Sequence, residues 1–365
     1  MNHPQGSNKA PTHLPRFIAW ENQLAEEPFC VHQPKAKPHP QSEMDAIDTA
    51  ILSSIQAGLP PDEQPFSALA RQLNLPASEM LARVQQLQDS GIIRRIGPVF
   101  DTQRLGYSST LVAARVPADR LLDVALLVNE LPGVTHNYRR EHDYNLWFTL
   151  TARSKEEIDN TLASIRKRTG IADIYSLPAV AVYRIAVNFA LGTGTAHTRQ
   201  SGVPSQAPAI LGEHDRHLVR LLQESLPVVE RPFDAIALAW GRTPADVVER
   251  IREWVASGVI RRFGAVVRHQ RLGYVANGMC VFNTPAERLD EAGRRLAECE
   301  MVSHCYSRPP APGWRYNLFA MMHSTSKEHV RRQAAALARE LAISDHDVLF
   351  STEEFKKASM RFFAE

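Results

Sequence analysis

One stretch of the chain occurs twice, and this repeat limits the possible folds more than any other feature. Residues 91–107 read GIIRRIGPVFDTQRLGY, and residues 258–274 read GVIRRFGAVVRHQRLGY. Eleven of the seventeen positions are identical, which chance does not supply. The chain of 365 residues is therefore a tandem duplication, and each half is expected to form the same elements.

The residues before each copy carry apolar side chains at helical spacing. In the first half, Ile47, Ile51 and Leu52 indicate a first helix, and similar patterns follow at 66–73 and 80–87. Three short helices that lead into an extended segment such as GIIRRI are typical of a winged helix-turn-helix. We predict one such unit at 44–100 and a second at 213–267.

The residues after each copy predict a second kind of unit. Their strands and helices follow the order β-α-β-β-α-β of the ferredoxin-like plan, here assigned to 101–191 and 268–365. The expected elements are a strand at 110–116, a helix at 121–131, a hairpin at 134–148, a helix at 155–168 and a strand at 174–182, then their counterparts at 276–282, 287–299, 302–319, 327–341 and 348–352.

The expected fold class is α+β, a tandem repeat of winged helix-turn-helix plus ferredoxin-like β-α-β-β-α-β domain. The two halves should pack as an internal pseudo-dimer, because each alone would leave one sheet face half covered. A proline-rich segment at 1–43 is predicted to be a disordered tail, and 192–212 is predicted to be a flexible linker.

Composition narrows the class of protein. Hydrophobic residues make up 44% and charged residues 22% of the chain, which is ordinary for a globular protein. No long apolar run or leading signal pattern is present, so we expect a cytoplasmic protein without membrane contact. The four cysteines lack C-x-x-C spacing and are expected to be free thiols. A net charge of +2 gives no global attraction to a polyanion.

The hairpin at 134–148, VTHNYRREHDYNLWF, carries an unusual set of side chains. We predict two strands joined by a two-residue loop at Glu141 and His142. Alternation then places five polar or aromatic side chains on one face, namely His136, Tyr138, Arg140, Asn145 and Trp147. The second half has His304, Tyr306, Arg308, Asn317 and Phe319 in the matching places. A core strand needs no such set, so we predict a binding surface that is used twice.

Several of these strings resemble a known family. The order of domains is similar to that of the leucine-responsive, or asparagine-operon, regulators. The strings GVIRRFGAV, HNYRREHDYNLWF, SHCYSRPPAPGWRYNLF and LFSTEEFKKASMRFF resemble the siroheme decarboxylases of the fused two-subunit type. The resemblance covers nearly all of 44–363. It implies removal of carbon dioxide from two acetate side chains of siroheme, which gives didecarboxysiroheme in heme biosynthesis of the denitrification type, with siroheme as substrate and no added cofactor.

The residue types suit that chemistry. Siroheme carries carboxylates around an apolar macrocycle, and arginine and aromatic side chains bind these two features. The candidate substrate-binding residues are Tyr138, Arg140, Asn145, Trp147, Tyr306, Arg308, Trp314 and Arg315. Histidine titrates in the range needed for proton transfer, and the candidate catalytic residues are His136, His142 and His304. One of these three could instead bind the siroheme iron, and no metal site formed by the protein alone is expected.

Two other functions are compatible with the same architecture. Winged helices occur in DNA-binding transcriptional regulators of the leucine-responsive family, and a non-catalytic heme sensor would need the same tetrapyrrole contacts. The candidate reading helices carry no net positive charge, which makes DNA binding unfavourable. Two tetrapyrrole pockets are possible by pseudo-symmetry, and the one around the first hairpin is preferred. Further homo-oligomerisation remains open.

Overall fold

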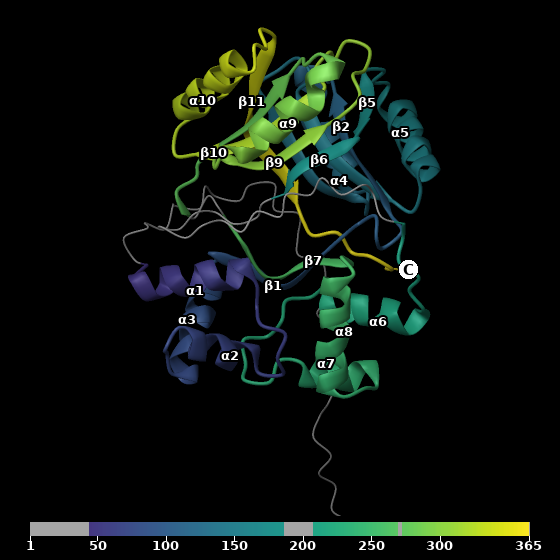
Figure 1. The fold of residues 1–365 in the computed structure, drawn as a ribbon. Coiled ribbons are helices and arrows are strands. Elements are labelled where there is room, and N and C mark those ends of the chain that lie inside the picture. The colour runs from purple at the N-terminus through teal and green to yellow at the C-terminus, as the bar shows by residue number, and fades with distance from the viewer. Residues whose placement is uncertain (1–43, 186–206, 269–271, 365) are drawn as a thin grey trace, which may run out of the picture. The chain divides into compact units, whose positions relative to one another are not determined.

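The computed structural model describes residues 44–185, 207–268 and 272–364. The predicted tail at 1–43 and most of the predicted linker at 192–212 lie outside these ranges. Within them the fold is α+β, with winged-helix and ferredoxin-like elements that occur twice in chain order (Figure 1). None of the helices in the described ranges is both long enough and apolar enough to cross a membrane.

The first winged-helix unit contains α1 (Ala46–Ala57), α2 (Pro65–Gln72), α3 (Ala77–Asp89) and β1 (Ile93–Phe100). The second contains α6 (Glu213–Leu222), α7 (Asp234–Trp240), α8 (Pro244–Ala256) and β7 (Ile260–Val267). Capping boxes start two of the helices, with Asp45 and Asp48 at α1 and with Thr243 and Asp246 at α8. Both units share one hydrophobic core, so neither is an independent domain.

The two winged-helix units are joined by an antiparallel pair of strands, β1 and β7, around which their helices gather (Figure 1). Gly97 pairs with Gly264, and these two glycines are equivalent positions of the repeat. A pseudo-twofold axis therefore passes between them. A Cβ atom on Gly264 would lie 2.3 Å from the carbonyl oxygen of Ile55, so the close approach of α1 to β7 requires glycine.

The ferredoxin-like elements of both halves form one nine-stranded sheet in the order β5-β2-β4-β3-β11-β8-β10-β9-β6. The first half supplies β2 (Ser108–Ala114), α4 (Leu121–Asn129), β3 (Val134–Arg140), β4 (Leu146–Ala152), α5 (Lys155–Thr169), β5 (Ile174–Pro178) and β6 (Ala181–Ile185). The second half supplies β8 (Ala276–Phe282), α9 (Leu289–Glu298), β9 (Val302–Ser307), β10 (Leu318–Ser324), α10 (Lys327–Glu340) and β11 (His346–Lys357).

Each half gives its last strand to the other. β6 pairs with β9, and the second part of β11 pairs with β3. The single strand predicted at 174–182 is therefore wrong, because the chain breaks there into β5 and β6. The strand predicted at 348–352 is too short, because β11 continues to Lys357 along β3. Alternation within a segment shows that it is a strand but not which strand it will join.

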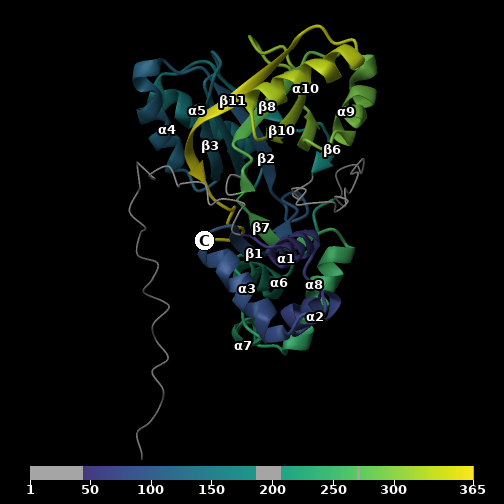
Figure 2. The same cartoon turned by 90° about the vertical axis from the view of Figure 1, so that its left-hand side faces the viewer.

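The two faces of this sheet have different partners. Helices α4 and α5 pack on strands of the first half, and α9 and α10 pack on strands of the second (Figure 2). The opposite face, called the inner face here, carries a separate hydrophobic cluster drawn from both halves. Ala113, Trp147 and Leu177 come from the first half, and Trp314 and Phe319 come from the second. The inner faces of the two halves thus pack on each other.

The predicted hairpin differs from the observed one in its loop. Five residues, 141–145, join β3 to β4, where two were expected. Tyr138 consequently lies opposite Trp147, whereas a two-residue loop would place it opposite Asn145. The register is shifted by two positions, an even number, so Tyr138 and Trp147 still share the inner face as predicted.

The contact at Gly264 gives a test of the pseudo-twofold packing. We expect Gly264→Ala to reduce the free energy of unfolding by about 3 kcal/mol or more, because backbone atoms of α1 would have to move. Gly212→Ala is the matched control, since Gly212 has a φ of −69° and open space around its Cβ position. That control should change stability by less than about 1 kcal/mol in urea denaturation. Equal stability of both variants would contradict the packing.

Candidate functional site

Two equivalent rows of side chains lie on the inner face. In β3, the rings of His136 and Tyr138 are 6.2 Å apart, and the guanidinium of Arg140 lies 5.8 Å from the Tyr138 ring. In β9 the corresponding ring distance, between His304 and Tyr306, is 6.1 Å. Arg308, directly after β9, completes this second row, 4.9 Å from the Tyr306 ring. The structure therefore brings six of the predicted site residues into two matching rows.

The two histidines of these rows bond the same kind of group, the hydroxyl of the preceding residue. Nδ1 of His136 is 2.9 Å from the hydroxyl of Thr135, and Nδ1 of His304 is 2.8 Å from the hydroxyl of Ser303. Burial, together with nearby cations, lowers the pKa of each ring to about 4. His304 is one of the groups that lower the pKa of His136, so each imidazole lies within the electrostatic reach of the other. Both rings are neutral at pH 7, and Nε2 of each is left for a ligand.

The two arginines of the rows are charged groups without a counterion. Arg140 donates to the carbonyl of Leu349 at 2.8 Å, and Arg308 donates to the carbonyl of Leu177. The Nε atom of each is buried without a hydrogen-bond partner. Burial lowers the pKa of each to about 10, and no carboxylate of the described residues forms an ion pair with either. A buried guanidinium in this state favours the binding of an anion.

Side chains from other elements complete the first row, and sequence analysis did not assign them to a site. Lys357 of β11 lies opposite His136, and its charge lowers the pKa of that ring. Arg94 of β1 does the same, while its guanidinium donates to Ser359 at 3.1 Å. The repeated Arg-Arg pairs were a usable signal for Arg94. No pattern in the sequence indicated Lys357, because its approach depends on the strand exchange.

The predicted aromatic contacts lie elsewhere. Trp147 and Trp314 are each 1% exposed, and their rings meet edge to face at 4.9 Å in the centre of the inner-face cluster. They were expected to offer a flat surface to a ligand. In the structure they are buried and pack the two halves against each other. Tyr138 and Tyr306 are only partly buried and are the aromatic rings that remain accessible within the rows.

Three further candidates lie outside the rows. His142 is in the loop between β3 and β4, where its Nδ1 accepts from the backbone of Tyr144 at 2.9 Å and its ring packs 5.3 Å from Trp314. Both oxygen and nitrogen of the Asn145 side-chain amide bond the backbone of Val116, and Asn317 bonds Thr284 in the same way. These two asparagines anchor the hairpins, which leaves no group for a substrate.

Arg315 also lies outside the rows. Its guanidinium donates to Asp345 at 2.9 Å, and its side chain is 63% exposed. This arginine was predicted to bind a substrate carboxylate, but its guanidinium already pairs with the carboxylate of Asp345. Asp345 therefore neutralises the charge of Arg315, whereas Arg140 and Arg308 have no carboxylate partner among the described residues.

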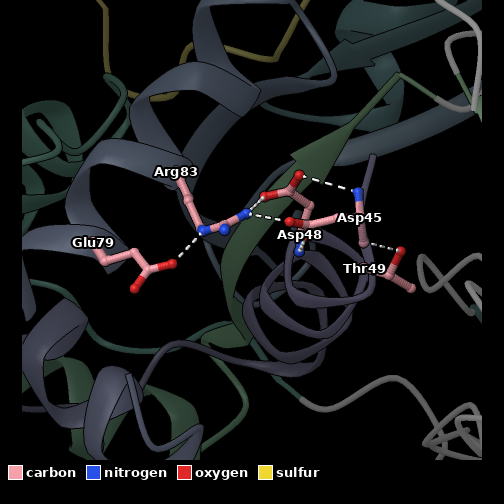
Figure 3. Close-up of polar contacts among 5 residues, drawn as sticks. All are labelled: Asp45, Asp48, Thr49, Glu79 and Arg83. Carbon is pink, nitrogen blue, oxygen red and sulfur yellow. Dashed lines mark hydrogen bonds and ion pairs between the residues drawn. The ribbon is translucent and has the colours of Figure 1, made fainter. Parts of the chain in front are cut away.

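The helices that would read DNA offer little positive charge. On α3, Arg83 forms ion pairs with Asp45 at 2.8 Å, Asp48 at 2.9 Å and Glu79 at 2.8 Å (Figure 3). These acids raise the pKa of Arg83 and hold its guanidinium against α1. On α8, Arg252 pairs with Glu249 at 3.0 Å. Arginines that are already paired contribute little to phosphate binding.

Two protein-family models match the winged-helix and the ferredoxin-like segments of the chain. A model described as the siroheme decarboxylase NirDL-like HTH domain matches residues 48–94 and 215–261. A model described as the AsnC-like ligand binding domain matches residues 104–184 and 271–356. Each model matches twice, once in each half, as the tandem duplication requires.

Curated relatives extend over most of the chain. A siroheme decarboxylase of Hydrogenobacter thermophilus is 37% identical over 86% of this chain and 94% of its own length. The siroheme decarboxylase NirDL subunit of Paracoccus pantotrophus is 38% identical over 86% of this chain and 96% of its own length. The siroheme decarboxylase alpha subunit of Desulfovibrio desulfuricans is 45% identical but covers 40% of this chain, about the length of one half.

Solved structures agree with these relatives. A crystal structure of the siroheme decarboxylase NirDL matches 87% of this chain and 95% of that chain at 35% identity, with a TM-score of 0.69. A second structure of NirDL, in complex with an iron-uroporphyrin III analogue, has the same identity and TM-score and covers 88% of this chain and 95% of that chain. The repeated domains, the full-length relatives and the matching structures together show that this chain belongs to the siroheme decarboxylases, a family of carboxy-lyases.

Proposed function

We propose that this protein removes carbon dioxide from two acetate side chains of siroheme, and that the reaction takes place on the inner face. The product would be didecarboxysiroheme, an intermediate of heme biosynthesis in the denitrification type of pathway. The observation that carries the proposal is the pair of rows in which two buried arginines without counterions lie next to two neutral histidines. Siroheme is the substrate, and no further cofactor is part of the proposal.

The charges of the rows suit a substrate with many carboxylates. Arg140 and Arg308 each have an Nε–H without a partner, and guanidinium binds carboxylate with two parallel hydrogen bonds. Tyr138 and Tyr306 sit beside these arginines with partly exposed rings, against which a flat macrocycle can stack. Their phenol pKa values are raised, mainly by burial, so both stay neutral and donate hydrogen bonds. The structure of NirDL with an iron-uroporphyrin III analogue supports a ligand of this class.

The histidines are strongly desolvated, yet neither residue is fully buried. A group that is surrounded by protein but still reachable from solvent is expected to line a recess. Because the hydroxyls of Thr135 and Ser303 hold the Nδ1 atoms, the Nε2 atoms are the ones that would face a bound substrate. This arrangement places two proton-transfer groups beside the two arginines that would hold the acetates.

The proposed chemistry balances with one proton for each acetate. The bond between the methylene carbon and the carboxylate carbon breaks, and carbon dioxide leaves without the bonding electron pair. That pair is taken up by the conjugated macrocycle of the substrate, and an imidazolium of the protein then protonates the methylene to give a methyl group. The protein supplies the proton and holds the carboxylate, and no electron is gained or lost overall.

The low pKa values of the histidines fit this role only if the substrate changes them. In the ligand-free protein both rings are neutral at pH 7. Several carboxylates beside the rings would favour imidazolium and raise both pKa values. The substrate would thereby create the proton donor that its own decarboxylation requires. In the absence of substrate, neither ring would carry the second proton that makes imidazolium an acid.

The function can be tested directly. Anaerobic incubation of the purified protein with siroheme should release two molecules of carbon dioxide, seen by mass analysis of the tetrapyrrole. His136→Ala should reduce the rate about 100-fold or more, because proton transfer is lost. His304→Ala should do the same where both rows donate protons, and should be milder where the His136 row alone reacts. His142→Ala should stay within about tenfold of the parent, since its Nδ1 serves a loop. An unchanged tetrapyrrole would leave a heme sensor, and full activity of both first variants would exclude the acid role.

The coupling between binding and protonation gives a second test. Between pH 6 and 7, siroheme binding should take up protons, up to about one for each of His136 and His304, since a pKa near 4 would rise toward or above the ordinary value of about 6.5. The uptake should fade above about pH 8. Calorimetric titration in buffers of different ionisation enthalpy measures it. Heats that do not depend on the buffer would contradict the proposed proton donor.

A further inference from the structure

The pseudo-twofold relation allows each residue around one histidine to be compared with its counterpart around the other. Lys357, on the strand that the second half gives to the first, lies opposite His136. Ile185, on the strand that the first half gives to the second, lies opposite His304. The same structural position is thus a cation in one row and an aliphatic side chain in the other.

The tyrosines of the two rows show the same difference. Glu354 lies opposite Tyr138, whereas Val182 lies opposite Tyr306. The ammonium of Lys357 is 3.9 Å from the Glu354 carboxylate, and its side chain is 19% exposed. The exchanged strand of the second half therefore brings two ionisable groups to the first row. At the two matching positions its counterpart, β6, brings aliphatic side chains, while Arg184 of β6 donates to the carbonyls of Ala297 and Cys299 and lies within electrostatic reach of His304.

A third position differs within the repeat itself. Asp101 and Arg268 occupy the same place of the two copies. Asp101 forms an ion pair with Arg261 at 2.9 Å, which neutralises the arginine that reaches the His304 row. Arg268 lies instead near Arg94, the arginine that reaches the His136 row. Burial lowers the pKa of Lys357, and the charges of Arg94 and Arg268 lower it further. The arginine that reaches the first row therefore has a second cation beside it, whereas the arginine that reaches the second row has a carboxylate partner.

The three differences act in the same direction. Around His136, Arg94 and Lys357 have a single carboxylate, Glu354, among their electrostatic partners, and Arg268 lies near both. Arg94 and Lys357 are partly desolvated while Arg268 is exposed, and the repulsion among the three cations is relieved when an anion is bound. Around His304 the corresponding positions hold Arg261, which is paired with Asp101, and the aliphatic Ile185 and Val182. Arg184 and Arg308 also lie within electrostatic reach of this ring.

We propose that the fused chain has one asymmetric site, in which Lys357, Arg94 and Arg268 bind the reacting carboxylate of the substrate at His136, while the His304 row receives a less charged flank of the macrocycle. This inference rests on the proposed function for the identity of the substrate. It adds which row is the reactive one and which residues determine that choice.

Exchanging the side chains between the rows tests the proposal. Lys357→Ile gives the first row the side chain that the second row has at this position. Ile185→Lys is the matched control and gives the second row the side chain of the first. The probe is iron-uroporphyrin, which is rich in carboxylates, titrated by its absorbance at low and at moderate salt. We expect Lys357→Ile to raise the Kd about tenfold and to weaken its salt dependence, because a charge-assisted hydrogen bond is lost. Ile185→Lys should change the Kd by less than about threefold.

A second substitution tests the charge of the repeat position. Arg268→Asp, which copies Asp101, should pair with Arg94 and raise the Kd of iron-uroporphyrin about tenfold or more. Thermal unfolding of each variant checks that the fold is retained. Equal losses from Lys357→Ile and Ile185→Lys, or parental affinity in both Lys357→Ile and Arg268→Asp, would overturn the asymmetric site.

The titration separates this inference from the proposed function because it requires no turnover. If siroheme stays intact but Lys357→Ile and Arg268→Asp alone weaken binding, the asymmetric anion site stands and decarboxylation is rejected. If siroheme is decarboxylated but the exchanges leave affinity and rate unchanged, decarboxylation stands and the asymmetry is rejected.

Discussion

The packing of the two inner faces is the interaction on which the rest of the structure depends. Trp147 and Trp314 come from different halves and meet at 4.9 Å in a cluster that neither half could bury alone. The reciprocal pairing of β6 with β9 and of β11 with β3 fixes the relative position of the two faces. With that position fixed, the two His-Tyr-Arg rows are held within electrostatic reach of each other, which a single half would not achieve.

The buried charges of the rows indicate that stability was not the only constraint. A guanidinium that is removed from water without a carboxylate costs free energy, and Arg140 and Arg308 are both in this state. Elsewhere in the described chain, Arg83 and Arg315 are paired with acids. Arg262 of the winged-helix strand pair is also buried without an ion pair and donates to the carbonyls of Gln56 and Ala265. Arg140 and Arg308 differ from Arg262 in lying beside two neutral histidines on the inner face, where a substrate carboxylate would supply their counterion.

Much of the fold could be predicted from sequence, because the repeat at 91–107 and 258–274 required two like halves and the order of elements gave the ferredoxin-like plan. The face shared by His136, Tyr138 and Arg140 was also predictable, since alternation survives an even shift in register. The strand exchange was not, because period-two patterning does not name a partner. Lys357 was missed for that reason. The burial of Trp314 could not be predicted either, because an aromatic residue gives the same sequence pattern in a core as in a binding site.

The most direct test of the account is a crystal structure of this protein with iron-uroporphyrin bound. The macrocycle is predicted to lie between the rows, with carboxylates about 3 Å from the guanidinium groups of Arg140 and Arg308 and with Nε2 of His136 facing a methylene carbon. A macrocycle bound away from the inner face, with both guanidinium groups still bonded only to the carbonyls of Leu349 and Leu177, would contradict it.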